Sequence, residues 1–169
     1  KSVGSFGDVA TWSFCQDKII STGGEGGMIT TSSEVIMDRV WSLKDHGKTL
    51  ESVFRKKHAP GYRFLHERLG SNFRITELQS AIGRIQLKKL SRWSSLRNKN
   101  AQILLQKLEN LSIINIPLPD SDIEHAWYKF YAYINVEFLS EEWDRNKIIN
   151  QINELGFPAF HGGCTEIYK

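Results

Sequence analysis

The hydrophobic and polar positions near the start of the chain alternate with a period of two. Trp12 and Phe14 lie on one face of residues 9–14, and the other face carries Ser13. Because its members are β-branched and aromatic, this alternation predicts a β-strand. A short second strand over residues 28–31 is predicted after a glycine-rich turn.

The next segment has the spacing of an amphipathic helix. Ser33 is suited to cap its first turn, and the apolar residues recur at i, i+4 and i+7, as Ile36, Val40 and Leu43. Residues 47–72 then show no clean period and are rich in Gly, His, Arg and Lys. No regular element is predicted there.

A longer helical region begins where Thr76 and Gln79 are placed to form a capping box. Most of its apolar residues share one face, but Leu87 and Leu90 do not. The region therefore either buries two faces or breaks near Ser91. We expect the break, which gives two helices ending near residue 108.

The C-terminal part combines a strand with a helix. Residues 128–136 alternate between apolar and polar positions, and Asp144 and Gly156 are suited to begin and end a final helix. We therefore expect an α/β fold. Residues 1–110 would form the end of a large domain with its helical region, and residues 111–169 a smaller α/β domain.

Composition narrows the classes of function. The 169 residues are 40% hydrophobic and 24% charged, as in ordinary soluble proteins, and the net charge of +3 does not by itself indicate nucleic acid or a membrane. Cys15 and Cys164 form no disulfide framework, so a cytoplasmic setting is expected. No apolar run approaches the roughly 20 residues that cross a bilayer. We expect no signal peptide and no metal site, and the non-methionine start at Lys1 suggests part of a longer chain.

The residues best suited to take part in a reaction lie around Lys18. The first predicted strand delivers the Ser13 hydroxyl, and Lys18 follows five residues later. Glycines on both sides of Glu25 allow the backbone to pass close to whatever the lysine touches. A lysine amine becomes nucleophilic when it is desolvated or lies near another cation. The ordinary alternative is a surface lysine beside a glycine-rich hairpin, which is the commoner situation.

Several blocks of this sequence resemble the DegT/StrS-type nucleotide-sugar aminotransferases. They are residues 4–8, 12–14 and 24–28 around Lys18, Lys-Asp-His-Gly at 44–47, Gly-Ser-Asn-Phe-Arg-Ile-Thr-Glu-Leu-Gln-Ser-Ala-Ile-Gly at 70–83, and His-Ala-Trp at 125–127. The blocks keep the family's order and spacing over essentially the whole chain. The resemblance implies the pyridoxal 5'-phosphate (PLP) transferase fold type I, which is aspartate-aminotransferase-like. Here it would comprise the end of the large PLP-binding domain and the small C-terminal domain.

The resemblance also implies roles for single residues. Lys18 matches the catalytic lysine that bonds covalently to PLP and later moves a proton between substrate and cofactor. Ser13 matches a hydroxyl that binds the PLP phosphate, and Asn72 an asparagine that reaches the phosphate from the neighbouring subunit of a homodimer. Arg74 is a further candidate for a phosphate or substrate contact. His161 lies where family members carry a loop that approaches the substrate sugar.

Each role has a plainer alternative. Ser13 could be a strand serine with a local hydrogen bond, Asn72 a turn residue before a helix, and His161 a loop histidine. Packing or hydrogen bonding is the favoured explanation of His46 and His125. The basic cluster at residues 55–58 is either a solvated loop or a surface that steers a diphosphate electrostatically.

The function implied by the resemblance is transamination of a nucleotide-linked keto-deoxysugar, with glutamate as the expected amino donor, for bacterial surface polysaccharide or O-antigen synthesis. In the family, an acidic partner of the pyridine nitrogen and an aromatic residue that stacks on the ring come from the first half of the protein. These 169 residues alone could therefore be catalytically silent. A nucleic-acid-binding module is a remote alternative, suggested by a basic stripe along the helical region formed by Arg84, Lys88, Arg92 and Lys99. Because the stripe borders an apolar face, ordinary snorkelling side chains explain it better.

Overall fold

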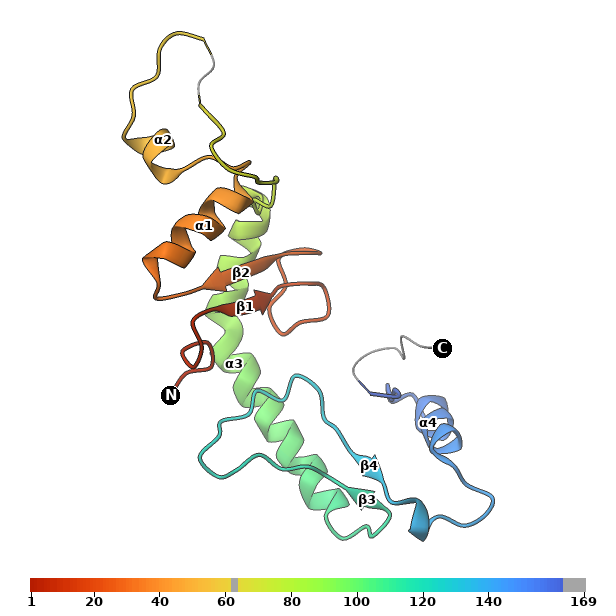
Figure 1. The fold of residues 1–169 in the computed structure, drawn as a ribbon. Coiled ribbons are helices and arrows are strands. Elements are labelled where there is room, and N and C mark those ends of the chain that lie inside the picture. Colours follow the sequence, from red (N-terminus) through yellow and green to blue (C-terminus); the bar gives the residue numbers. More distant parts are fainter. Residues whose placement is uncertain (62–63, 163–169) are drawn as a thin grey trace. The chain divides into compact units, whose positions relative to one another are not determined.

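The computed structural model describes residues 1–61 and 64–162 of the chain. The chain divides into two compact units, Lys1–Leu90 and Ser91–Lys169, and the long helix α3, Glu77–Leu108, contributes residues to both (Figure 1). The domain boundary expected between residues 110 and 111 stays a prediction.

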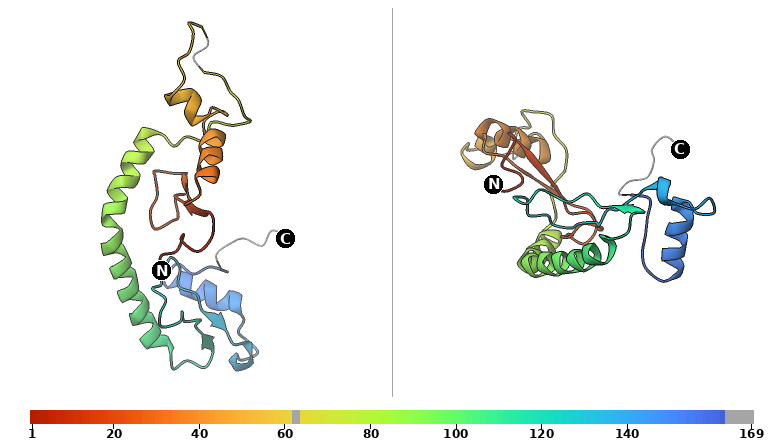
Figure 2. Two further views of the ribbon diagram at one scale, coloured as in Figure 1. Left: turned by 60° about the vertical axis from the view of Figure 1, so that its left-hand side comes forward. Right: turned by 90° about the horizontal axis from the view of Figure 1, so that it is seen from below.

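The first unit begins with an antiparallel hairpin. Strand β1, Ala10–Ser13, pairs with strand β2, Gly27–Thr30, in a register that sets Ser13 opposite Gly27. Both strands were predicted from the period-two pattern. The connecting residues 14–26, here called the Lys18 loop, lie beside the first half of α3 (Figure 2).

Helix α1, Glu34–Lys44, begins as the sequence predicted, because the Ser33 hydroxyl accepts a hydrogen bond from the backbone N–H of Ile36 at 3.4 Å. A short helix that the sequence did not predict follows it. Helix α2, Leu50–Phe54, is capped by Thr49, whose hydroxyl accepts from the Ser52 N–H at 3.1 Å. Five residues are too few to reveal a helical period.

Helix α3 corrects one expectation. It runs for 32 residues without a break at Ser91. Two features explain its continuity: no proline or glycine occurs between Arg84 and Leu108, and the Ser95 hydroxyl donates to the Ser91 carbonyl at 3.0 Å, a bond that a helix accommodates. Leu87 stays 60% exposed. Leu90 is half-buried, so the second apolar face is only partly covered within the described chain.

The second unit pairs strand β3, Ile114–Asn115, with strand β4, Tyr133–Ile134, in antiparallel register. The strand predicted over residues 128–136 is therefore mostly wrong. Trp127 has a φ of 48°, and the Arg97 guanidinium donates to the carbonyls of Trp127 and Tyr128 at 3.1 and 3.2 Å. These carbonyls bond to a helix side chain and not to a neighbouring strand.

The last elements are the 3-10 helix η1, Val136–Phe138, and helix α4, Arg145–Glu154. As predicted, the Asp144 carboxylate caps α4 by accepting from the Lys147 N–H at 2.8 Å. Gly156 follows the helix with a φ of 87°, in the left-handed region that glycine adopts without strain.

Candidate active site

Lys18 lies in a tight turn directly after β1. Its backbone N–H donates to the Cys15 carbonyl at 3.1 Å, and its amine forms an ion pair with Asp17 at 3.1 Å. The Lys18 side chain is one-third exposed. The amine is therefore accessible and has a carboxylate partner.

Hydrogen bonds within the Lys18 loop hold its shape. The Phe14 N–H donates to the Gly26 carbonyl at 2.8 Å, and the Thr22 N–H donates to the Phe14 carbonyl at 3.2 Å. Thr22 is buried, and its hydroxyl donates to the Glu25 carbonyl at 3.1 Å. A Cβ atom at Gly26 would lie 2.3 Å from the Thr22 hydroxyl oxygen, so only glycine fits there.

Helix α3 braces this loop from outside. The Gln79 side-chain amide donates to the Glu25 carbonyl at 2.7 Å, and the Gln86 side-chain carbonyl accepts from the Ser21 N–H at 2.8 Å. The absent side chain of Gly83 allows the helix to approach the loop closely. Sequence reasoning missed both glutamines as supports of the site, although Gln79 was visible as part of the capping box.

Ser13 ends β1 with an exposed side chain. Its hydroxyl oxygen accepts from the Cys15 N–H at 3.4 Å, so its O–H remains available as a donor. Ser13 and Lys18 thus offer a hydroxyl and an amine from one short turn. A hydroxyl can donate a hydrogen bond to a phosphate, and an amine can react with an aldehyde, so the turn could serve both groups of one cofactor.

A second set of polar residues lies where the segment after α1 contacts the segment before α3. Asp45 and Asn72 form an antiparallel bridge. Gly47, with a φ of 78°, allows this contact, because a Cβ atom there would lie 1.7 Å from the Arg68 carbonyl oxygen. Two sequence blocks whose bridged residues are 27 positions apart therefore lie side by side.

Side chains on this bridge form what is called here the Asn72 cluster, namely Asp45, His46, Lys48, Asn72 and Arg74. The Arg74 Nε donates to Asn72 Oδ1 at 3.0 Å. The two terminal nitrogens of Arg74 lie 3.4 Å from Asp45 Oδ1 and 3.2 Å from His46 Nε2.

Asp45 is the buried anion of this cluster. It is 8% exposed and accepts from the Lys48 amine at 3.2 Å. Burial alone would raise the pKa of the Asp45 carboxyl. The Lys48 hydrogen bond and the positive charges of Lys48, Arg74 and Lys44 outweigh this and hold that pKa below its usual range.

The structure thus brings the predicted site residues into two groups. Ser13 and Lys18 share one turn, and Asn72 and Arg74 share one cluster. No hydrogen bond or ion pair between described residues joins the two groups. His161 is exposed and belongs to the second unit, whereas both groups lie in the first.

The other histidines and the basic loop have structural partners. His125 Nδ1 accepts from the Trp127 N–H at 3.1 Å, and the rings of His125 and Trp127 have centroids 4.6 Å apart. His46 Nε2 lies 3.2 Å from an Arg74 nitrogen, so both histidines have the hydrogen-bonding role predicted for them. In the basic cluster, Lys56 pairs with Glu67 at 3.1 Å, and this hydrogen bond raises the pKa of Lys56. That charge is therefore already balanced.

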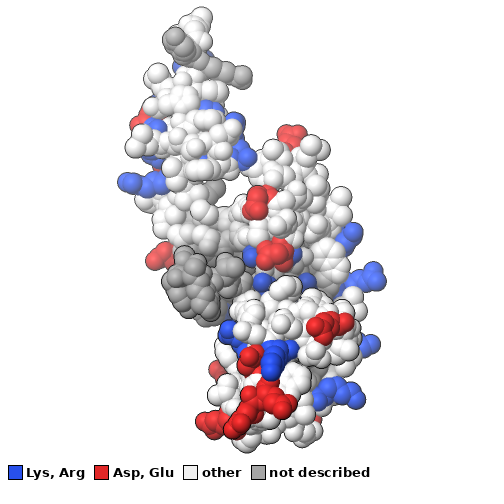
Figure 3. Space-filling model, turned by 90° about the vertical axis from the view of Figure 1, so that its right-hand side faces the viewer, with Lys and Arg blue, Asp and Glu red and all other residues white. Residues whose placement is uncertain are grey.

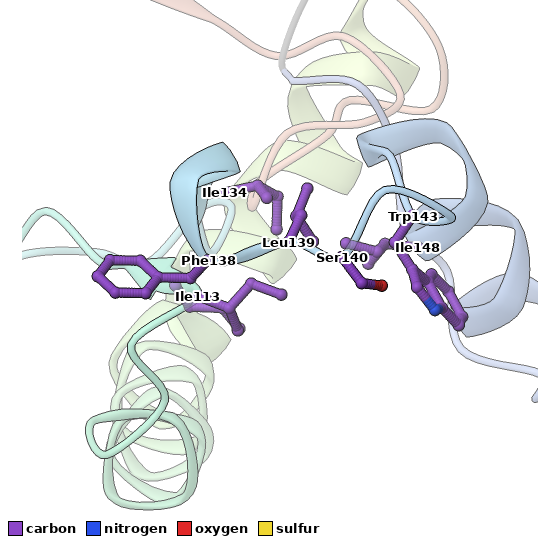
Figure 4. A pocket seen from close by; sticks show the side chains of 8 residues that line it. Ile113, Ile134, Phe138, Leu139, Ser140, Trp143 and Ile148 are labelled. Atoms are coloured by element: carbon purple, nitrogen blue, oxygen red, sulfur yellow. The ribbon is translucent and has the colours of Figure 1, made fainter.

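One apolar hollow of about 450 Å³ lies in the second unit (Figure 4). Its lining is Ile113, Ile114, Ile134, Phe138, Leu139, Ser140, Trp143 and Ile148. It contains none of the candidate site residues and no charged group.

The described residues also bear on metal binding, membrane insertion and nucleic-acid binding. No group of three or more His, Cys, Asp or Glu suited to a metal ion occurs in residues 1–61 and 64–162. In those same segments, every helix is too short or too polar to span a lipid bilayer. On the face drawn in Figure 3, Lys and Arg side chains are interspersed with Asp and Glu and form no continuous basic surface.

Solved structures share this fold. An aminotransferase from Psychrobacter cryohalolentis is 45% identical, with a TM-score of 0.89 over 99% of this chain and 45% of its own. The Escherichia coli GDP-4-keto-6-deoxy-D-mannose-3-dehydratase, solved with bound hydrated PLP, is 29% identical, with a TM-score of 0.77 over 92% of this chain and 40% of its own. These matches confirm the expected fold type I of PLP-dependent transferases.

Curated relatives and the family comparison agree with this. The GDP-perosamine synthase of Vibrio cholerae is 36% identical over 138 residues, which are 82% of this chain and 34% of the relative. The chain thus spans less than half the length of these proteins. Residues 1–159 match the DegT/DnrJ/EryC1/StrS aminotransferase family over nearly the whole sequence, and the chain belongs to that family.

Proposed function

We propose that these residues serve a PLP-dependent transaminase that acts on a nucleotide-linked keto-deoxysugar, with glutamate as amino donor. The observation that carries the proposal is the braced turn in which Ser13 and Lys18 offer a hydroxyl and an amine within five residues. The names of relatives support the substrate class, since they include GDP-perosamine synthases and a dTDP-amino-sugar transaminase of Streptomyces venezuelae. A solved 3-dehydratase with a trapped PLP-glutamate species supports glutamate.

In this proposal PLP supplies the electron sink for the reaction. Lys18 would hold the cofactor through its amine, and the same amine would carry a proton to and from the reacting carbon of the substrate. Asp17, whose Oδ1 lies 3.1 Å from the Lys18 amine, would help to hold that amine in place. The Ser13 hydroxyl would donate to the cofactor phosphate and help to orient the cofactor.

Asn72 would donate to the phosphate of a second subunit, so the working enzyme is proposed to be a homodimer with shared sites. The resemblance supports this, because the family's matching asparagine reaches the phosphate from the neighbouring subunit. We further propose that the activity is cytoplasmic and serves surface polysaccharide or O-antigen synthesis. One relative is a spore coat polysaccharide biosynthesis protein of Bacillus subtilis.

The proposal is tested by Lys18→Ala in the full-length protein. The unsubstituted protein should show an absorbance band at about 400–430 nm that borohydride bleaches, because a lysine-bound cofactor is reducible. Lys18→Ala should lose this band, and transaminase turnover should fall by at least about 100-fold, since the proton-transfer group is gone.

The matched control is Lys107→Ala, in the last turn of α3 and far along the chain from the Lys18 loop. It should keep both the band and the turnover. A Lys18→Ala protein that retained turnover near the original rate would refute the assignment of Lys18.

The product distinguishes transamination from the dehydratase chemistry of other relatives. Transamination replaces a carbonyl oxygen by an amine and keeps every hydroxyl, whereas dehydration removes one hydroxyl. Mass spectrometry of the product from a 4-keto-6-deoxy nucleotide sugar and glutamate should show the amine. A product whose sugar lacks a hydroxyl and carries no amine would contradict the proposed transamination.

A further inference from the structure

Arg74 has the geometry of a residue that acts through its neighbour. We propose that Arg74 orients the Asn72 amide for a phosphate and does not itself contact the phosphate or the sugar substrate. This rests on the proposed function, in which Asn72 binds the PLP phosphate of the partner subunit.

The backbone around Asn72 is fixed first. The Ser71 N–H donates to the Leu43 carbonyl at 2.8 Å, and the Phe73 N–H donates to the Lys44 carbonyl at 3.0 Å. These bonds flank Asn72 on both sides and anchor it to the end of α1. Only the side-chain torsions remain to be set.

The Arg74 guanidinium sets the direction of the amide. A guanidinium can only donate, so the Asn72 atom that lies 3.0 Å from Arg74 Nε must be the oxygen. The amide plane is then fixed, with the two N–H groups of Nδ2 on the side away from Nε. Within the described residues Nδ2 donates to no acceptor. The two N–H groups of Asn72 therefore have a fixed direction and are available to donate to a phosphate oxygen.

Arg74 is held by groups of the protein at each of its three nitrogens. Besides Asn72 at Nε, Asp45 Oδ1 lies 3.4 Å from one terminal nitrogen and His46 Nε2 lies 3.2 Å from the other. Asp45 also offsets the positive charge. The three nitrogens of this guanidinium already contact protein groups, and its charge is already paired with a carboxylate. Such a guanidinium is suited to orient Asn72 and is less suited to bind a further anion.

A double-mutant cycle tests the inference in the full-length protein. The dissociation constant of PLP is measured by titrating the cofactor-free protein, with the variants Asn72→Ala, Arg74→Ala and the pair. Each single change should weaken PLP binding, Asn72→Ala by about tenfold, as for a lost hydrogen bond to a charged group. Arg74→Ala should add no further weakening in the Asn72→Ala background, because its effect runs through the amide.

Arg74→Lys separates orientation from charge and is the variant less prone to misfold. Lysine keeps the positive charge but cannot hold Asn72, Asp45 and His46 at once. We therefore expect weakened PLP binding with Arg74→Lys as well. At saturating PLP, both Arg74 variants should have an unchanged KM for the sugar substrate.

The matched control is Arg68→Ala, which removes an arginine paired with Asp38 at 2.6 Å near the same bridge but without contact to Asn72. It should leave PLP affinity unchanged. Additive effects in the cycle, full retention of affinity by Arg74→Lys, or a raised KM would each overturn the positioning role. If Asn72→Ala alone leaves PLP affinity unchanged, the proposed role of Asn72 fails and the role of Arg74 fails with it.

Discussion

At the scale of single residues, the Asn72 cluster depends on one buried carboxylate. Asp45 accepts from Lys48 and lies beside Arg74, so its negative charge balances two cations that are otherwise close together. Each cation would repel the other without it. The charge of Asp45 should therefore contribute to stability at neutral pH.

We expect Asp45→Asn to lower the free energy of unfolding of the full-length protein at pH 7 by about 1–3 kcal/mol, the cost of unpairing buried charged groups. The folded pKa of Asp45 is lowered from the ordinary value of 3.8. The stabilisation is thus complete well above that value and is lost as pH falls through the lower folded pKa. Urea unfolding should show the gap between the two proteins narrowing below about pH 4. A gap that is constant down to about pH 2 would contradict this.

Residue types alone could not have predicted the positioning role proposed for Arg74. The sequence predicted roles for Lys18, Ser13 and Asn72 through blocks that resemble a family, and it offered Arg74 as a candidate for a phosphate or substrate contact. The orientation of Arg74 depends on His46, which is 28 residues away and is brought close only by the bridge at Asn72. A contact of that range leaves no local pattern in the chain.

At the scale of elements, the helix starts were predictable and the longer-range features were not. Ser33, Thr76 and Asp144 all cap helices as expected, because a cap needs only a side chain and an N–H group two or three residues later. The length of β4 depends on a distant partner. Arg97 on α3 takes the carbonyls that a longer β4 would have used.

The close approach of α3 to the Lys18 loop should depend on Gly83. A Cβ atom at Gly83 would lie 2.9 Å from Thr22 Cγ2, and Thr22 is only 3% exposed. Alanine favours a helix over glycine by about 1 kcal/mol, but overpacking a buried contact costs about 1–3 kcal/mol. We therefore expect Gly83→Ala to lower the free energy of unfolding of the full-length protein.

Thr22→Ser provides the matched partner, because it removes Cγ2 and keeps the hydroxyl that donates to Glu25. The pair Gly83→Ala with Thr22→Ser should be more stable than the sum of the single effects predicts, as measured by urea unfolding. Purely additive effects would show that the contact does not limit the approach of the helix.

At the scale of the whole molecule, little apolar surface is covered. Among the described residues, Ala101 and Trp127 are the buried hydrophobic side chains, whereas Leu69, Leu78 and Phe6 are 94%, 79% and 72% exposed. Exposed apolar surface on this scale normally marks contact with other protein. The chain also matches less than half the length of its relatives.

The 169 residues alone should therefore bind PLP weakly or not at all. They supply a hydroxyl, an amine and an amide, but the family resemblance assigns the partner of the pyridine nitrogen and the stacking aromatic residue to a segment outside them. With so few buried side chains, the Lys18 loop is also held mainly by its internal hydrogen bonds and by those to α3. Titrating the isolated chain and the full-length protein with PLP, followed by absorbance and borohydride reduction, compares the two directly. We expect at least about a 100-fold weaker dissociation constant for the isolated chain, since several contacts worth about 1 kcal/mol each are absent. Equal affinity would show that these residues form a complete cofactor site by themselves.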